Sequence, residues 1–177
     1  MAALYALLVS ILAPISIPVI QIRVADLMMP LSILFGWPAV VGVTIGAGLG
    51  NLVGDTVLGN TGAQTGIDVV LGSLANFVAA TLAWKISHQN WTIRGRRASW
   101  LIAVNTETLI IALIVGMYLG YLFSIPFLIS IGGILAGSIV AISVGGYSLL
   151  KILSRPKTLA SLRSTGLVVA ERSSREL

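Results

Sequence analysis

The amino-acid sequence predicts an all-α integral membrane protein with six transmembrane helices. Of its 177 residues, 56% are hydrophobic and 10% are charged, and the mean hydropathy is +0.99. A soluble domain carries about 25% charged residues, which cover its surface. Because this chain lacks the side chains for such a surface, its composition excludes a water-soluble enzyme and a nucleic-acid-binding domain. Apolar runs near the length that crosses a bilayer, and basic residues confined to two regions, support the same fold class.

The first three apolar runs lie in the N-terminal third of the chain. Residues 1–18 form the first run, which has no basic start and no clear cleavage site, so we interpret it as a retained helix. A polar stretch at 21–26 precedes a short second run at 27–35. Gly36-Trp37-Pro38 predicts a tight break before the third, glycine-rich run at 39–53.

The remaining runs are longer. Residues 54–62 combine glycine, aspartate and asparagine, which predicts a loop. Runs four, five and six follow at 67–86, 100–123 and 127–153, with Pro126 between the last two. A helix needs about 20 apolar residues to cross a bilayer core about 30 Å thick. We therefore expect six membrane segments, of which the second is short.

The basic residues predict the orientation. Ten of the 11 lie in or beside the loop between runs four and five, or at and beyond the end of run six: Lys85, Arg94, Arg96, Arg97, Lys151, Arg155, Lys157, Arg163, Arg172 and Arg175. With six spans, both regions share one side, which the positive-inside rule makes cytoplasmic together with both termini. We expect residues 1–154 to form a six-helix transmembrane domain and 155–177 a basic cytoplasmic tail. The pI of about 10.1 then reflects membrane topology, and no nucleic-acid partner is expected.

Three stripes of small residues recur at a spacing of four. Such stripes let helix backbones approach closely in lipid. They comprise Gly42, Gly46, Gly50 and Gly54; Gly133, Gly137, Ala141 and Gly145; and Ala2 and Ala6. We expect the stripes of runs three and six to pack within the bundle, whereas the alanine face of run one could dock a partner subunit.

Ionisable residues on the predicted outer side need an explanation. Arg23 is the only basic residue there, and Asp26, Asp55 and Asp68 share that side, which gives a formal balance of −2. Ionisable groups at membrane depth are expensive and are functional candidates. Structural alternatives remain open: a local Arg23–Asp26 pair at i, i+3, a turn at Asp55, and a first-turn helix cap at Asp68.

Polar residues inside the spans form a second set of candidates. Glu107 lies seven residues past Trp100, about 10 Å along a helix, so its carboxyl group should face the bundle interior. Its alternatives are a structural, hydrogen-bonded carboxyl group and a ligand or coupling-ion contact. Asn105 points to a different helical face. Asn51 and Asn76 are membrane amides whose ordinary role is hydrogen bonding between helices.

No catalytic or metal-binding motif is present. The chain has no cysteine and one histidine, and it lacks a Gly-x-Ser-x-Gly elbow and a Walker A loop. We therefore expect no enzyme and no metal site. Active transport would have to draw its energy from an ion gradient or from another subunit.

Three stretches carry a resemblance to a known family, which covers about residues 2–105. They are Gln21-Ile22-Arg23-Val24-Ala25-Asp26-Leu27 with Pro30, Gly36-Trp37-Pro38-Ala39 with Gly42, Gly46 and Asn51, and Gly66-Ile67-Asp68-Val69-Val70-Leu71-Gly72-Ser73-Leu74-Ala75. In this pattern the chain resembles the QueT family, substrate-binding (S) components of energy-coupling-factor (ECF) transporters. In the third stretch the acid follows the first glycine by two positions, whereas the family pattern has three.

The resemblance implies a fold, partners and a ligand. It implies an S-component-like bundle in the plasma membrane that binds a queuosine precursor, a 7-deazaguanine, from outside. Such proteins join a transmembrane coupling subunit and two cytoplasmic ATPases, which use ATP, and the S component itself carries no cofactor. The Ala2-x-x-x-Ala6 face is similar to the alanine motif with which S components dock the coupling subunit.

The candidate residues suit this ligand chemically. A carboxylate can accept the two N–H groups on one edge of a deazaguanine, while Arg23 or Gln21 could donate to its carbonyl group. An aminomethyl cation on the ligand would pair with a second acid. The site prediction comprises Gln21, Arg23, Asp26, Asn51 and Asp68, with Asn105 and Glu107 behind them. Trp37 is either a stacking surface or an interfacial belt tryptophan.

Other functions stay open at this point. The chain could be an S component for another vitamin or nucleobase, because specificity resides in the site and not in the fold. It could also be a stand-alone ion-coupled carrier that uses Glu107 or Asp68 as the titrating group. An intramembrane enzyme lacks its nucleophile–base pair, and a membrane scaffold would bind no ligand.

Overall fold

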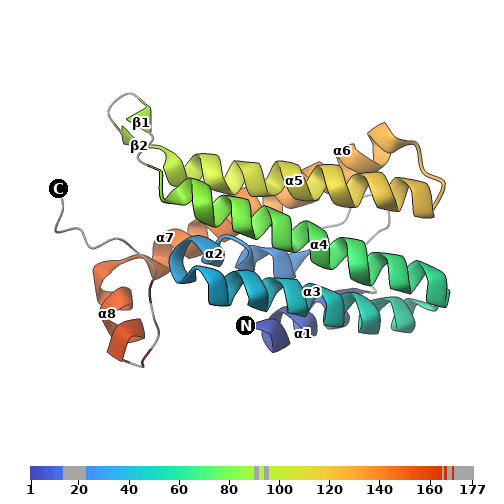
Figure 1. Ribbon diagram of the computed structural model, residues 1–177, viewed down its shortest axis with the longest axis horizontal. Helices are drawn as coiled ribbons and strands as arrows, with labels where there is room; N and C mark the ends of the chain where they lie inside the picture. Colours follow the sequence, from blue (N-terminus) through green and yellow to red (C-terminus); the bar gives the residue numbers. More distant parts are fainter. Residues whose placement is uncertain (14–22, 90–91, 94–95, 165, 167–168, 170–177) are drawn as a thin grey trace.

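The computed structural model describes residues 1–13, 23–89, 92–93, 96–164, 166 and 169. These residues form a bundle of roughly antiparallel helices (Figure 1). In chain order the elements are α1 (Ala2–Leu12), η2 (Val24–Met28), α2 (Leu31–Phe35), α3 (Trp37–Leu58), α4 (Gly62–Ser87), β1 (Thr92–Ile93), β2 (Arg96–Arg97), α5 (Ser99–Leu122), α6 (Phe127–Ser138), η3 (Ile139–Gly146), α7 (Tyr147–Leu153) and α8 (Pro156–Ser164).

The lengths of the helices support a membrane protein. Among the described residues, four helices are long and apolar enough to cross a bilayer: Trp37–Leu58, Gly62–Ser87, Ser99–Leu122 and Phe127–Leu153. Two shorter apolar helices, Ala2–Leu12 and Val24–Phe35, accompany them. Large apolar side chains such as Val70, Met117 and Leu128 are exposed on the outside of the bundle, as a lipid-facing surface requires. The all-helical membrane class is thus supported, while the count of six spans and the cytoplasmic termini stay predictions.

The predicted second segment is broken in two. The 3₁₀ helix η2 begins inside the stretch that we expected to be polar, and α2 follows it after Pro30. Proline has no backbone N–H group, so it cannot continue a helical hydrogen-bond ladder. Gly36 then separates α2 from α3 with φ of 65°, a conformation that favours glycine, and Pro38 lies in the first turn of α3.

The loop predicted for residues 54–62 is wrong in extent. Helix α3 continues to Leu58, so Asp55 is helical, and Gly59 ends the helix in the left-handed conformation. Thr61 caps α4 through a capping box with Gln64. Because this cap starts α4 at Gly62, Asp68 lies well inside the helix and its predicted role as a first-turn cap is wrong.

The glycine stripe of α3 packs against α1, as expected. A Cβ atom added at Gly46 would lie 2.7 Å from the Cβ of Tyr5 and 2.9 Å from the carbonyl oxygen of Ala2. The other glycines of the stripe face Met1, Val9 and Ala13 in the same register. This close approach places the Tyr5 side chain in the centre of the bundle, fully buried.

The predicted docking face of α1 is partly exposed. Ala2 and Ala6 are partly buried beside the α3 contact, and the exposed side chains of α1 are led by Leu4, Leu7 and Ile11. The role of Ala2 and Ala6 in binding a partner stays a prediction.

The sixth run is one long helix with a π-helical centre, η3. Gly145 and Gly146 lie in η3 against Leu27 and Pro30, so the wider helix accommodates the η2 segment. The short hairpin of β1 and β2 and helix α8 lie at one end of the bundle (Figure 1). Several of the basic residues belong to these elements, so charge gathers at this end, as the topology prediction requires.

Candidate functional site

A cavity of about 370 Å³ lies at the end of the bundle opposite to the hairpin and α8. The ends of α1, α3 and α5, the beginning of α4, Arg23 and the start of η2 line it. Its wall is mainly apolar, formed by Leu8, Val9, Leu12, Ala13, Val24, Ala25, Gly54, Leu58, Leu119, Leu122 and Phe123. Its polar lining comprises Arg23, Asn51, Asp55, Asn60 and Asp68.

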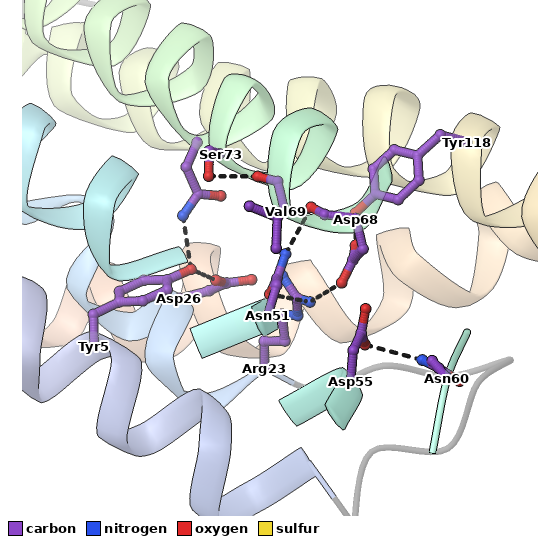
Figure 2. Close-up of polar contacts among 11 residues, drawn as sticks. Tyr5, Arg23, Asp26, Asn51, Asp55, Asn60, Asp68, Val69, Ser73 and Tyr118 are labelled. Atoms are coloured by element: carbon purple, nitrogen blue, oxygen red, sulfur yellow. Dashed lines mark hydrogen bonds and ion pairs between the residues drawn. The ribbon is translucent and has the colours of Figure 1, made fainter. Parts of the chain in front are cut away.

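Three of the predicted residues meet in this cavity. Arg23 Nη2 donates to Asn51 Oδ1 at 2.9 Å and lies 3.7 Å from Asp68 Oδ2. Asn51 Nδ2 donates to the backbone carbonyl of Asp68 at 3.0 Å. The amide of Asn51 thus holds both the guanidinium group and the helix that carries the acid (Figure 2).

Two further residues of α4 and α5 complete this cluster. Tyr118 donates its hydroxyl hydrogen to Asp68 Oδ1. Gly72, one turn after Asp68, faces the Asn51 side chain so closely that a Cβ atom would collide with Nδ2. Glycine is therefore required at this position for α3 and α4 to share the Asn51 contact.

A second polar cluster lies beside the first. Tyr5 donates its hydroxyl hydrogen to Asp26 Oδ1, and Asn76 Nδ2 donates to the Tyr5 oxygen at 2.8 Å and to the Val43 carbonyl at 3.3 Å. The local Arg23–Asp26 pair considered for the sequence is replaced by this arrangement, because Arg23 pairs with Asp68 instead.

The two clusters are adjacent. A small cavity of about 10 Å³ is lined by Arg23, Asp26 and Asn76, by apolar residues of α5 and α6 and by Ser138. Arg23 therefore borders both cavities and connects the ligand-sized one to the centre of the bundle.

Asp55 joins the site from the last turn of α3. Its Oδ1 atom accepts from Asn60 Nδ2 at 3.0 Å, and its Oδ2 atom is buried without a hydrogen-bond partner among the described residues. The backbone of the turn supports this arrangement, since the Asn60 N–H group donates to the Asp55 carbonyl at 3.0 Å. The sequence suggested a turn-forming role for Asp55, whereas the structure directs its carboxylate to the cavity.

Glu107 is fully buried, as expected, but it does not line the cavity. Neither of its carboxyl oxygens has a hydrogen-bond partner among the described residues. Asn105 is exposed on the other side of α5, where its Nδ2 donates to the Leu101 carbonyl and its Oδ1 accepts from Ser143 at 3.4 Å. The expectation that these two side chains point to different faces is confirmed.

Trp37 lies far from the cavity. It begins α3 and is separated from Asn51 by 14 residues, about 21 Å along a helix. Its ring is 48% exposed and packs near Phe77 and Trp84, with ring centroids 5.8 Å and 6.2 Å away. This placement favours the interfacial belt over the stacking surface. Gln21, the remaining candidate, lies outside the described residues.

Sequence reasoning missed Tyr5 and Tyr118. Each is a hydroxyl-bearing ring in an otherwise apolar helix, and each donates to a buried acid. The available signal was chemical: a buried carboxylate needs donors, and a tyrosine in a membrane span can supply one. Nothing in the spacing showed which tyrosine meets which acid.

Comparison with known protein families gives a match, whereas comparison with individual proteins does not. Neither the curated proteins nor the solved structures include a match to this chain. A family model described as QueT transporter matches residues 1–155, which include every helix that lines the cavity. The match covers most of the chain and runs beyond the stretches that carried the resemblance. The protein is therefore a member of the QueT transporter family.

Proposed function

We propose that the protein is the membrane-embedded substrate-binding subunit of an ATP-driven uptake transporter of the ECF type. We further propose that its ligand is a queuosine precursor of the 7-deazaguanine class. The single observation that carries this proposal is the cavity of about 370 Å³, where Arg23, Asn51 and Asp68 converge between apolar walls. Small-molecule sites typically have volumes of about 300–1,000 Å³ with a few convergent polar groups.

The polar side of the cavity suits the edge of a deazaguanine. Each carboxylate oxygen has about two acceptor positions. Asp68 uses one position on Oδ1 for Tyr118, so it keeps capacity for N–H groups of a ligand. The remaining N–H groups of Arg23 can donate to a ring carbonyl group. The apolar side chains, among them Leu119 and Phe123, offer contacts to the faces of a flat bicyclic ring.

The direction of transport is supported by the distribution of charge. The cavity and the basic elements occupy opposite ends of the bundle. Since basic residues remain on the cytoplasmic side, the cavity faces the outside in this proposal. A binding subunit for uptake needs its site there.

The partners follow from the family resemblance. S components of ECF transporters act with two cytoplasmic ATPases and a transmembrane coupling subunit, and the lack of a Walker A loop in the 177 residues fits ATP use by such partners. We assign the docking of the coupling subunit to α1, through Ala2 and Ala6 and the exposed side chains beside them.

Calorimetry on the purified chain in detergent tests the ligand. Aminomethyl, cyano and unsubstituted 7-deazaguanines are titrated alongside guanine, thiamine and riboflavin. We expect sub-micromolar binding of a deazaguanine alone. Binding of thiamine or riboflavin instead would identify an S component for another vitamin, and flat titrations of folded protein would contradict the proposal.

Co-expression with an ECF module tests the assembly. The proposal predicts that the chain co-purifies with the coupling subunit and that uptake requires ATP hydrolysis. Substitution of Ala2 and Ala6 by leucine should weaken co-purification while ligand binding persists, because neither residue lines the cavity. Uptake by the chain alone would contradict the assembly.

Glu107 favours a second candidate, a stand-alone ion-coupled carrier. The Glu107 carboxyl group is buried without a hydrogen-bond partner among the described residues, which is unusual in a membrane protein and commonly marks an ion or proton pathway. This candidate predicts uptake into vesicles that contain the chain alone, which stops when the proton or sodium gradient is dissipated. Glu107→Gln would then abolish uptake.

A further inference from the structure

Three exposed cations surround the turn between α7 and α8. Lys151 lies in the last turn of α7, Arg155 lies between the two helices, and Lys157 lies in the first turn of α8. The turn is held by its backbone. The Arg155 N–H group donates to the Ile152 carbonyl at 3.3 Å, and the Arg155 carbonyl accepts from the Leu159 N–H group at 2.9 Å. The three cations are therefore presented from one short, hydrogen-bonded segment.

The length of the preceding helix places this turn near the lipid headgroups. Phe127–Leu153 has 27 residues. A helix of that length measures about 40 Å, so it can cross a hydrocarbon core about 30 Å thick and end in the headgroup region. Ile152, the neighbour of Lys151, is 50% exposed. The apolar surface that suits lipid thus continues up to the cations.

Helix α8 has the orientation of an interfacial helix. It lies at the end of the bundle beside α7 and runs across the direction of the long helices (Figure 1). Leu159 is buried in the apolar core and anchors α8 to the bundle, whereas Lys157 and Arg163 are exposed. A helix with an anchored apolar side and a basic side is typical of a membrane surface.

The positive charge of the turn is not offset by acids. Residues 108–170 contain no aspartate or glutamate. Within the described part of the chain, Lys151, Arg155 and Lys157 form no ion pair with a carboxylate. Lys151 Nζ lies 4.5 Å from the centroid of the Tyr147 ring, and a contact with a ring face leaves N–H groups of the ammonium able to donate to an anion.

We propose that Lys151, Arg155 and Lys157 form a binding site for the headgroup of an anionic phospholipid such as phosphatidylglycerol. The guanidinium group can donate two N–H groups to phosphate oxygens, and the two ammonium groups add point charges. The exposed Ile152 side chain favours a lipid, because it offers an apolar contact to an acyl chain next to the cations. None of the three residues lines the ligand cavity, so the inference does not depend on the transported ligand.

A comparison of two lipids on the full wild-type chain tests the site. Native mass spectrometry in detergent measures the dissociation constant of the first bound phosphatidylglycerol and of the first bound phosphatidylcholine, which have the same acyl chains. We expect phosphatidylglycerol to bind at least about tenfold more tightly, because each basic residue near an anionic surface contributes about fivefold. An excess of glycerol 3-phosphate should not displace it. Equal affinity for the two lipids, or displacement by the free phosphate ester, would overturn the inference.

Charge-removing and charge-keeping variants locate the effect. Lys151→Gln with Arg155→Gln and Lys157→Gln should reduce the preference for phosphatidylglycerol to less than about twofold, with the melting midpoint used to confirm folding. Lys151→Arg with Arg155→Lys and Lys157→Arg should keep most of the preference. A full preference in the charge-removing variant would overturn the inference. If that variant instead lost an interaction with a cytoplasmic subunit, the basic face would be a protein contact.

Lys85→Gln is the matched control for Arg155→Gln. Lys85 is an exposed cation in the last turn of α4, at the same end of the bundle but outside this turn. Arg155→Gln should weaken phosphatidylglycerol binding about fivefold, and Lys85→Gln should change it by less than about twofold. An equal loss in the two variants would indicate a diffuse surface charge and not a site, which would overturn the inference.

Discussion

Asp68 and Glu107 are two buried acids of one bundle in opposite circumstances. Asp68 is 4% exposed, pairs with Arg23, accepts from Tyr118 and borders the large cavity. Glu107 is 0% exposed, lies outside that cavity and has no hydrogen-bond partner among the described residues. Burial alone therefore does not place an acid at the cavity of this protein.

The difference between the two acids lies in their neighbours. An acid with several donors can remain charged in a low-dielectric interior and present that charge to a ligand. An acid without donors is stable there only as a neutral group, because an isolated buried carboxylate is very unfavourable. The first arrangement suits recognition, and the second suits a proton or a purely structural role.

Removal of the Arg23 guanidinium group should cause the largest loss of ligand affinity. Arg23→Ala would leave Asp68 without its ion-pair partner and Asn51 Oδ1 without its donor. Truncation of one member of a buried charge pair costs about 2–5 kcal/mol, which corresponds to a loss of roughly 30-fold to several thousandfold. Calorimetry with 7-aminomethyl-7-deazaguanine measures the loss, and Arg23→Lys, which keeps the charge, should lose less. Unchanged affinity in Arg23→Ala would show that Asp68 and Arg23 do not bind the ligand.

Removal of the Asn51 amide, which contacts both Arg23 and the Asp68 carbonyl, should have the next largest effect. Asn51→Leu would deprive the Asp68 carbonyl of its donor and Arg23 of its acceptor. Unsatisfied buried groups cost about 1–3 kcal/mol, so we expect affinity to fall roughly 5- to 150-fold. Asn76→Leu is the comparison, because Asn76 bonds to Tyr5 and Val43 and does not line the large cavity. If the two variants lost affinity equally, the cavity would not be the ligand site.

Removal of one hydroxyl group should have a smaller effect. Tyr118→Phe keeps the ring of α5 and removes the hydrogen bond to Asp68 Oδ1. A single hydrogen bond to a charged group is worth about 1.5–3 kcal/mol, part of which the freed oxygen can recover from the ligand. We therefore expect a loss of up to about tenfold, measured in the same titration. A loss as large as that of Arg23→Ala would mean that the contact with Tyr118 matters as much for ligand binding by Asp68 as the contact with Arg23.

Replacement of the unpartnered acid should leave affinity unchanged. Glu107→Leu removes two buried oxygens that have no hydrogen-bond partner in the part of the chain that the structure describes, and it fills the space with an apolar side chain of similar size. We expect the free energy of unfolding to rise by about 1–3 kcal/mol, seen as a higher melting midpoint in detergent. A loss of ligand affinity in this variant would end the contrast between the two acids, and a loss of gradient-driven uptake would favour the ion-coupled carrier.

The sequence was sufficient for the membrane class and for much of the site. Arg23, Asn51 and Asp68 were identified because charged and amide groups are rare and costly in an apolar chain, so each must have a role. The packing of the α3 glycines was predictable for a related reason: small residues at a spacing of four create a smooth helix face.

Helix boundaries were less predictable from local signals. Glycine and aspartate at 54 and 55 favour a turn in isolation, yet both lie in α3, where Gly54 packs against Ala13 at the end of α1. The capping box at Thr61 was present in the sequence and marks the true start of α4. Tertiary packing overrides single-residue turn preferences, whereas a cap that satisfies free N–H groups holds its position.

What the sequence by itself determined is which polar residues this apolar chain must accommodate, because composition alone makes each of them expensive. What the tertiary structure decided is their pairing. Arg23 meets Asp68 across 45 positions of the chain and not Asp26 three positions away, and Tyr118 reaches Asp68 from another helix. These partners depend on the register of α3, α4 and α5, which is set by close glycine contacts together with interhelical hydrogen bonds. The spacing of residues along the chain does not predict this register.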